Sequence, residues 1–91
     1  MPITWTAEAI GDLQSNRLYI ADFNPAAAEG MARRLLDAAE GLVLFPARGD
    51  RVADNRRRLS TVPPYSIYYR LQQEQVVILR VLHDRQDVSA L

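Results

Sequence analysis

The sequence predicts an α+β fold of order β-α-α-β-β-β, in which a helical hairpin packs on a small twisted antiparallel sheet. Two runs of β-branched and aromatic residues, at 65–71 and 76–82, flank a polar break at 72–75 and predict a β-hairpin. A similar run at 56–62 lies just before them and ends at two prolines. The first half of the chain instead repeats apolar residues at helical spacing, which predicts two helices.

A short strand and a helix open the chain. Residues 2–5 are apolar and place Ile3 and Trp5 in alternation, which predicts an edge strand, where a leading proline is tolerated. Thr6 is a suitable N-cap, and we expect the helix to run from residue 7 to about residue 22. Its predicted apolar stripe consists of Ile10, Leu13, Arg17 and Ile20.

A second, longer helix is predicted from Pro25 to about Leu44. Asn24 is a good N-cap, and proline fits the first helical position. Because few residues separate the two helices, they should form an antiparallel hairpin. The predicted stripe of the second helix consists of Ala28, Met31, Leu35, Ala38, Ala39, Leu42 and Phe45.

A polar loop at 46–55 and three strands complete the chain, and the tail from Asp84 onward is expected to be ordered only in part. Side chains alternate along each strand. In the run 56–62, alternation separates Leu59 and Thr61 from Arg58, Ser60 and Val62. The first hairpin strand has Tyr65, Ile67, Tyr69 and Leu71 on one face and Ser66, Tyr68 and Arg70 on the other. The second has Val77, Leu79, Val81 and His83 on one face and Val76, Ile78, Arg80 and Leu82 on the other.

Neither hairpin strand is polar along a whole face. A sheet that is largely apolar on both faces is usually covered on both sides. One helical hairpin covers only one face, so we expect an exposed apolar strip on the second. Such a strip on a small protein predicts an interaction surface.

Length and composition limit the classes of protein that fit. Ninety-one residues predict a single domain, 1–91. All eleven basic residues are arginine, and they balance eleven acidic residues, which argues against affinity dominated by a phosphate backbone. There is no cysteine and one histidine, so we expect no metal site and no cofactor, and any catalysis should be metal-independent. No membrane span or signal peptide is predicted, and we expect a cytoplasmic protein.

Four stretches resemble the RelE/ParE superfamily of bacterial toxins from toxin–antitoxin modules. They are TAEAIGDL at 6–13, NPAAAEGMARRLLDAAEGLVLFP at 24–46, PPYSIYYRL at 63–71 and VVILRVLHDRQD at 76–87. The resemblance covers most of the chain in family order. It implies a helical hairpin against a twisted sheet, and a cognate antitoxin that wraps the toxin in a hetero-oligomer.

The resemblance implies one of two activities. RelE-like members cleave mRNA in the ribosomal A site, whereas ParE-like members poison DNA gyrase and have no established catalytic residues. RelE-type nucleases have an arginine after the tyrosine that opens the central strand, and here that position is Ser66. This chain also lacks lysine and has no tyrosine after His83. We therefore predict a ParE-like gyrase inhibitor. The alternatives are a RelE-like mRNA endonuclease, or a degenerate toxin that only binds its antitoxin.

The candidate functional residues are mostly arginines. The predicted partner-binding set is Arg56, Arg57, Arg58, Tyr68, Arg70, Arg80 and Arg85. If the chain is a nuclease, the catalytic candidates are Arg58, Arg70, Arg80 and His83, the last as general acid or base.

Each candidate also has a structural interpretation. The histidine could be a hydrogen-bonded strand end, and the run 56–58 could be a solvated strand face. Arg70 and Arg80 could pair with Asp84, Asp87 or the helices rather than line a binding groove. The tyrosines of the central strand could stack on bases or belong to the core.

Overall fold

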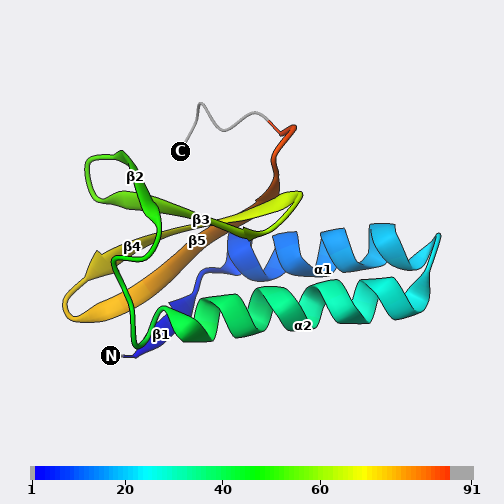
Figure 1. Ribbon diagram of the computed structural model, residues 1–91, viewed down its shortest axis with the longest axis horizontal. Coiled ribbons are helices and arrows are strands. Elements are labelled where there is room, and N and C mark those ends of the chain that lie inside the picture. Colours follow the sequence, from blue (N-terminus) through cyan, green and yellow to red (C-terminus); the bar gives the residue numbers. More distant parts are fainter. Residues whose placement is uncertain (1, 87–91) are drawn as a thin grey trace.

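The computed structural model describes residues 2–86 and confirms the predicted α+β architecture (Figure 1). The elements are β1 (Ile3–Trp5), α1 (Ala7–Ala21), α2 (Pro25–Gly41), β2 (Asp50–Ala53), β3 (Arg56–Val62), β4 (Tyr65–Gln72) and β5 (Gln75–His83). The strands form one sheet in the order β1-β5-β4-β3-β2. Both helices lie along the same face of this sheet, and their connecting tip extends beyond it (Figure 1). Residues 87–91, the end of the tail predicted to be ordered only in part, lie outside the described residues.

The helices begin at the predicted caps. Thr6 accepts a hydrogen bond from the backbone N–H of Ala9, and Asn24 accepts one from Ala27, each at 3.1 Å. These bonds satisfy N–H groups that have no partner inside the helix. The second helix ends at Gly41, three residues before the predicted end. Turns rather than further helix connect it to Pro46.

The central hairpin turns through only two residues. Gln73 and Glu74 both have positive φ, 52° and 61°. Positive φ at both central residues is the geometry of a type I′ turn, which matches the twist of the flanking strands. Asn-Gly usually marks such a turn, and this chain adopts it without either residue.

Two bulges correct the predicted strand faces. Opposite β4, the partner of Tyr68 is Arg80 and the partner of Tyr69 is Ile78, so Leu79 is an extra residue in β5. A bulge reverses the alternation beyond it. The core side of β5 therefore carries Val76, Ile78 and Val81, and the opposite side carries Val77, Arg80 and Leu82. A second shift, between Leu59 and Val62, likewise turns both of these β3 residues into the core.

Two further differences concern the sheet edges. The strand β1 is an edge strand as predicted, but it pairs parallel to β5, so the sheet is not purely antiparallel. The predicted loop 46–55 contains the strand β2, whose side chains are all exposed. An exposed strand has no apolar alternation to reveal it in the sequence, which explains why it was missed.

The hydrophobic core lies between the helices and the sheet. Most of the predicted stripe residues belong to it, including Leu35 and Leu42, which are fully buried. Two predictions were wrong: Ile10 is 45% exposed and Phe45 is 66% exposed. On α1 the buried position is instead Ala9, whose small side chain lets the helix approach the sheet closely. No helix between residues 2 and 86 is long and apolar enough to cross a membrane.

Leu35→Ala tests this core directly. Leu35 is fully buried on α2, so its truncation should lower the free energy of unfolding by about 2–5 kcal/mol. The adjacent Leu36 is 38% exposed and serves as a matched control, for which we expect a loss well below about 1 kcal/mol. Urea denaturation of the two variants compares them. Equal losses would show that the helix presents a different face to the sheet.

Candidate functional site

The sheet face opposite the helices is a row of arginines around one tyrosine. Strand register places Arg58, Tyr68 and Arg80 side by side across β3, β4 and β5. The next row places Arg56 opposite Arg70. Directly opposed residues have Cβ atoms about 4.5–5.5 Å apart, so these side chains are neighbours. The structure therefore brings together most of the predicted partner-binding residues.

Arg80 is neutralised within the chain. Its Nε and Nη2 donate to Asp12 Oδ2 and Oδ1 at 2.7 and 2.9 Å, a bidentate pair. These hydrogen bonds to Asp12 raise the pKa of Arg80 above its usual value. Of the interpretations considered for this residue, pairing with a helix is the one that the structure bears out. A partner would have to displace Asp12 to use this arginine.

Polar side chains of α1 also cover the edge of β5 beyond the short strand β1. Asp12 Oδ2 accepts from the Val81 N–H at 3.0 Å, and Asn16 donates to the Val81 carbonyl at 3.2 Å. The Thr6 hydroxyl donates to the Leu79 carbonyl at 3.0 Å. An exposed edge strand can pair with another chain. These bonds block that route along β5, whereas the exposed strand β2 forms the opposite edge of the sheet.

Arg57 points to the helix side, because its strand partner is the core residue Tyr69. Its Nη1 donates to the carbonyls of Gly49 and Ala47 at 2.8 and 3.2 Å. The Tyr69 hydroxyl donates to the Pro46 carbonyl and accepts from the Gly49 N–H, both at 2.8 Å. Burial of the ring raises the pKa of Tyr69. Together these two side chains hold the loop between α2 and β2.

The close fit of this loop requires a glycine. A Cβ atom at Gly49 would lie 2.8 Å from the Tyr69 ring and 2.9 Å from the Arg58 carbonyl oxygen. Real Cβ atoms do not approach that closely, and the backbone oxygen cannot move aside easily. The sequence shows Gly49 but not its neighbour, so the contact could not be predicted.

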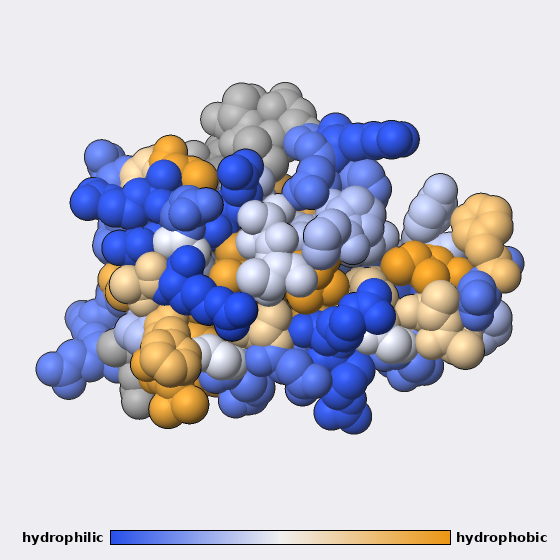
Figure 2. Space-filling model, in the orientation of Figure 1, coloured by the Kyte–Doolittle hydropathy of each residue, from blue (hydrophilic) through white to orange (hydrophobic). Residues whose placement is uncertain are grey.

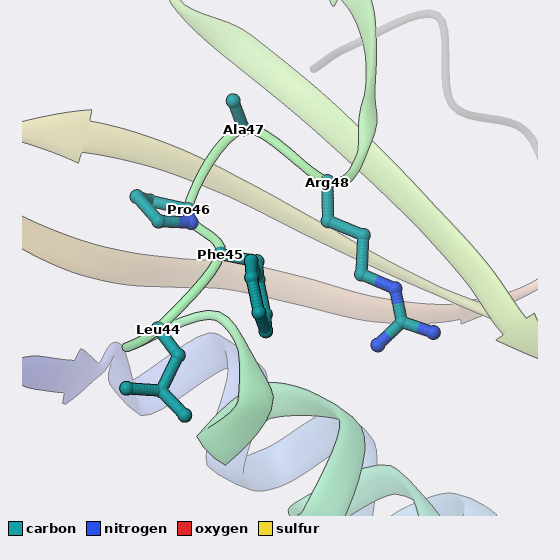
Figure 3. A pocket seen from close by; sticks show the side chains of 5 residues that line it. All are labelled: Leu44, Phe45, Pro46, Ala47 and Arg48. Atoms are coloured by element: carbon teal, nitrogen blue, oxygen red, sulfur yellow. The ribbon is translucent and has the colours of Figure 1, made fainter.

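The held loop presents two exposed apolar side chains. Leu44 is 76% exposed and lies with Phe45 beside an open hollow of about 770 Å³, also lined by Pro46, Ala47 and Arg48 (Figure 3). Phe45 and Arg48 extend in the same direction, beside the last turn of α2 (Figure 3). Such a hollow admits an apolar side chain of a partner next to a positive charge. Sequence reasoning missed it because Phe45 continues the apolar stripe of α2.

A second exposed apolar group lies at the tip of the helical hairpin. Phe23 is 77% exposed and packs edge-on against Tyr19 at 5.5 Å between ring centroids, with exposed Leu18 on the preceding turn. Hydrophobic surface gathers at this end of the molecule, and hydrophilic surface gathers over β2 and β3 (Figure 2). Exposed apolar side chains therefore lie at the hairpin tip, in the loop after α2 and, with Val52, on β2.

The predicted apolar strip on the second sheet face is not present among the described residues. Tyr68 is 5% exposed, and the other apolar side chains of that face, Val77 and Leu82, are also buried. The physical reason is the bulge in β5, which puts an arginine on this face. Arg58 and Arg80 flank the tyrosine ring, and their long aliphatic stems suit apolar surface.

His83 lies at the end of β5, where its ring packs edge-on against Tyr65 at 5.4 Å between centroids. Its Nδ1 accepts a hydrogen bond from the Arg85 N–H at 3.1 Å, which fits the predicted hydrogen-bonded strand end. Beside it, the buried Ser66 hydroxyl donates to Asp84 Oδ1 at 2.6 Å. A carboxylate therefore lies at this end of the sheet face, next to Ser66. Arg85 is exposed, and Asp87 lies outside the described residues.

Three arginines of the face have no acidic partner. The described residues form two ion pairs, Arg17–Glu29 and Arg80–Asp12, so Arg56, Arg58 and Arg70 remain unpaired within this part of the chain. Over the same range, no three histidine, cysteine, aspartate or glutamate side chains lie close enough to hold a metal ion. The arrangement offers fixed positive charge.

Comparison with known proteins identifies the family. A profile described as the ParE toxin of the type II toxin–antitoxin system, parDE, matches residues 3–88. The chain belongs to this family. The predicted resemblance to the RelE/ParE superfamily, with the ParE-like branch favoured, is thereby confirmed.

Two proteins are similar to this chain, one in sequence and one in fold. Toxin RelE2 of Caulobacter vibrioides (strain ATCC 19089 / CIP 103742 / CB 15) is 42% identical over 81 residues, which is 89% of this chain and 92% of that protein. A solved structure described as the chromosomal ParDE TA system from P. aeruginosa matches with a TM-score of 0.78 and 23% identity. It covers 91% of this chain and 95% of that one, and this likeness shows the shared fold.

In this ParE family member, Asp12→Asn should destabilise the join between α1 and β5. The change removes the charge that Arg80 meets and leaves one of three hydrogen bonds without an acceptor. We expect the free energy of unfolding to fall by about 1–3 kcal/mol in urea denaturation. Asp37→Asn, on the exposed side of α2, is the control and should change little. Identical midpoints for the two variants would contradict this role of Asp12.

Tyr69→Phe should release the loop and change the response to alkali. The lost hydroxyl leaves the Pro46 carbonyl and the buried Gly49 N–H unpaired, which should cost about 1–3 kcal/mol. Because burial raises the pKa of Tyr69, its stabilising contribution is complete below about pH 10 and is lost as pH rises through the higher folded value.

Thermal unfolding over an alkaline pH series checks this expectation. Tyr69→Phe should lose less stability above about pH 10 than the parent protein. Tyr65, whose pKa burial also raises, accounts for a residual alkaline loss. Asp37→Asn, at an exposed position of α2, is the control and should follow the parent. A variant that matches the parent at every pH would argue against Tyr69 as the anchor.

Proposed function

We propose that this chain is the toxin of a type II toxin–antitoxin module, that it inhibits DNA gyrase by binding, and that a cognate antitoxin neutralises it. The observation that carries the proposal is the pairing of Ser66 with Asp84 at 2.6 Å. Phosphate chemistry at that end of the face needs positive charge, and a carboxylate there opposes it. Membership of the ParE family supports the same conclusion.

The arrangement of the other candidates also favours binding over catalysis. Asp12 already neutralises Arg80, and the loop carbonyls engage Arg57. The Nδ1 atom of His83 accepts a backbone hydrogen bond. Arg57, Arg80 and the Nδ1 atom of His83 are thus already engaged within residues 2–86. A binding mode of action needs no general acid and base.

A ribosome-dependent mRNA endonuclease is the second candidate. Two observations favour it: the 42% identical relative is named Toxin RelE2, and the sheet face keeps three unpaired arginines. In this alternative Arg58 and Arg70 would hold RNA phosphates, and His83 Nε2 would transfer a proton. A degenerate toxin that only binds its antitoxin would show neither activity.

The antitoxin is the expected partner in each of these cases. The structurally similar protein is described as part of a ParDE system, which supports a partner of the same class here. Two apolar surfaces suit such a partner: the hairpin tip with Phe23, and the hollow beside Leu44 and Phe45. A segment that folds on binding would bury them as a helix along the helical hairpin. Gyrase and ribosomes both place the proposed activity in the cytoplasm.

Two assays on the purified chain decide between the candidates. Supercoiling by purified gyrase should be inhibited, with broken DNA accumulating. Primer extension on mRNA engaged by ribosomes should show no new cleavage. The control is the chain mixed with the protein encoded beside its gene, which should restore supercoiling. Cleavage of mRNA in the ribosomal A site would overturn the gyrase proposal, and inactivity in both assays would support the degenerate toxin.

A further inference from the structure

Arg56 and Arg70 form an opposed pair at one end of the helix-free sheet face. Strand register places them directly across from each other on β3 and β4. Like charges directly opposite each other destabilise a sheet. Both side chains are only partly exposed, so water screens their repulsion incompletely. The free protein therefore places two positively charged side chains at opposed positions beside one hollow, which is unfavourable.

Nothing within the described residues compensates this pair. The turns on either side carry Asp54 and Glu74, yet neither carboxylate forms an ion pair. The Nε atom of Arg70 is buried and has no hydrogen-bond partner in the described part of the chain. Buried polar atoms are satisfied in the great majority of cases, so an unsatisfied guanidinium nitrogen points to a missing acceptor.

The surroundings hold the pair in place. Asn55 Nδ2 donates to the Leu71 carbonyl at 3.2 Å, which ties the β2–β3 turn to β4. Arg51 Nη2 donates to the Asp54 carbonyl at 2.8 Å within the same turn. A hollow of about 200 Å³ opens there, and Arg56, Arg70 and Gln72 are among the residues that line it. An acceptor that enters it meets donors already in position, so little ordering is needed.

We propose that Arg56 and Arg70 form a carboxylate-binding subsite for an acidic side chain of the antitoxin. A guanidinium donates through a planar fork that matches the two oxygens of a carboxylate. One carboxylate between the two groups removes their repulsion and supplies the acceptor that Arg70 Nε lacks. This inference depends on the antitoxin partnership proposed above but not on the cellular target of the toxin.

The charge distribution favours a protein carboxylate over a nucleic acid. A polyanion would extend along the face and meet Asp84 at its other end. The whole chain also has zero net charge, which gives no broad attraction for a phosphate backbone. A single acidic side chain enters the hollow without meeting Asp84.

The first test measures antitoxin binding by calorimetry with four variants. Arg56→Gln and Arg70→Gln should each raise the dissociation constant about 10- to 100-fold. The double variant should raise it little more, because both arginines bind the same carboxylate. Arg70→Lys keeps the charge but loses the fork, so its effect should be intermediate. Arg33→Gln, on the exposed side of α2, removes the same charge outside the subsite and should weaken binding less than either subsite variant. Rising salt should weaken antitoxin binding by the parent protein more than binding by the double variant.

A second test does not require the antitoxin. Titration of the free protein with a short polyglutamate peptide should shift the NMR signal of the Arg70 Nε–H, and the shift should shrink in Arg56→Gln, which keeps Arg70 but removes its partner in the subsite. Melting temperatures of the unbound variants, equal to or above that of the parent, would show that they fold. If the parent protein shows this shift but does not bind the protein encoded beside its gene, the antitoxin partnership is refuted and the subsite is retained.

Two outcomes would overturn the subsite. The first is an antitoxin affinity unchanged in the folded double variant, together with an Arg70 peptide shift unchanged in Arg56→Gln. The second is a response of Arg70 to single-stranded RNA, but not to polyglutamate, that Arg56→Gln weakens. That result would assign the pair to nucleic-acid phosphate instead.

Discussion

The carboxylate of Asp12 joins the two layers of this fold. One side chain on α1 accepts three hydrogen bonds, two from Arg80 and one from the backbone of Val81. This contact fixes the helix along the edge of β5, where β1 is too short to continue the sheet. The antiparallel partner α2 is placed in turn, because it packs beside α1 and against β3. The same contact removes one arginine from the exposed charge of the opposite face.

Local signals in the sequence predicted what depends on local chemistry. Thr6 and Asn24 marked the helix starts because an N-cap acts on groups two or three residues away. The central hairpin was visible because its strands are rich in β-branched and aromatic residues. The family resemblance followed from the same segments.

The remaining features depend on contacts between distant residues. No residue type marks the bulge at Leu79 in the sequence, yet the bulge decides whether Arg80 or Val81 faces the core. The anchoring of the loop by Tyr69 joins residues 20 or more positions apart. For the candidate site, the sequence identified the arginines but not which of them have partners within the chain. It could not show that Asp12 and the loop carbonyls bind two of them, while Arg56 and Arg70 have no acidic partner.

The bulge in β5 also limits how this protein can change in length. A one-residue deletion at Leu79 would remove the extra residue and restore simple alternation, with Arg80 still on the arginine face and Val81 still toward the core. Closing the bulge with Leu79 retained would instead turn Arg80 toward the core and Val81 toward the arginine face. Within β5, a change of one residue is thus accommodated at the bulge, whereas elsewhere in the strand it reverses the faces beyond it. Related sequences aligned across β5 should therefore be matched by the inward or outward direction of each side chain rather than by residue count alone.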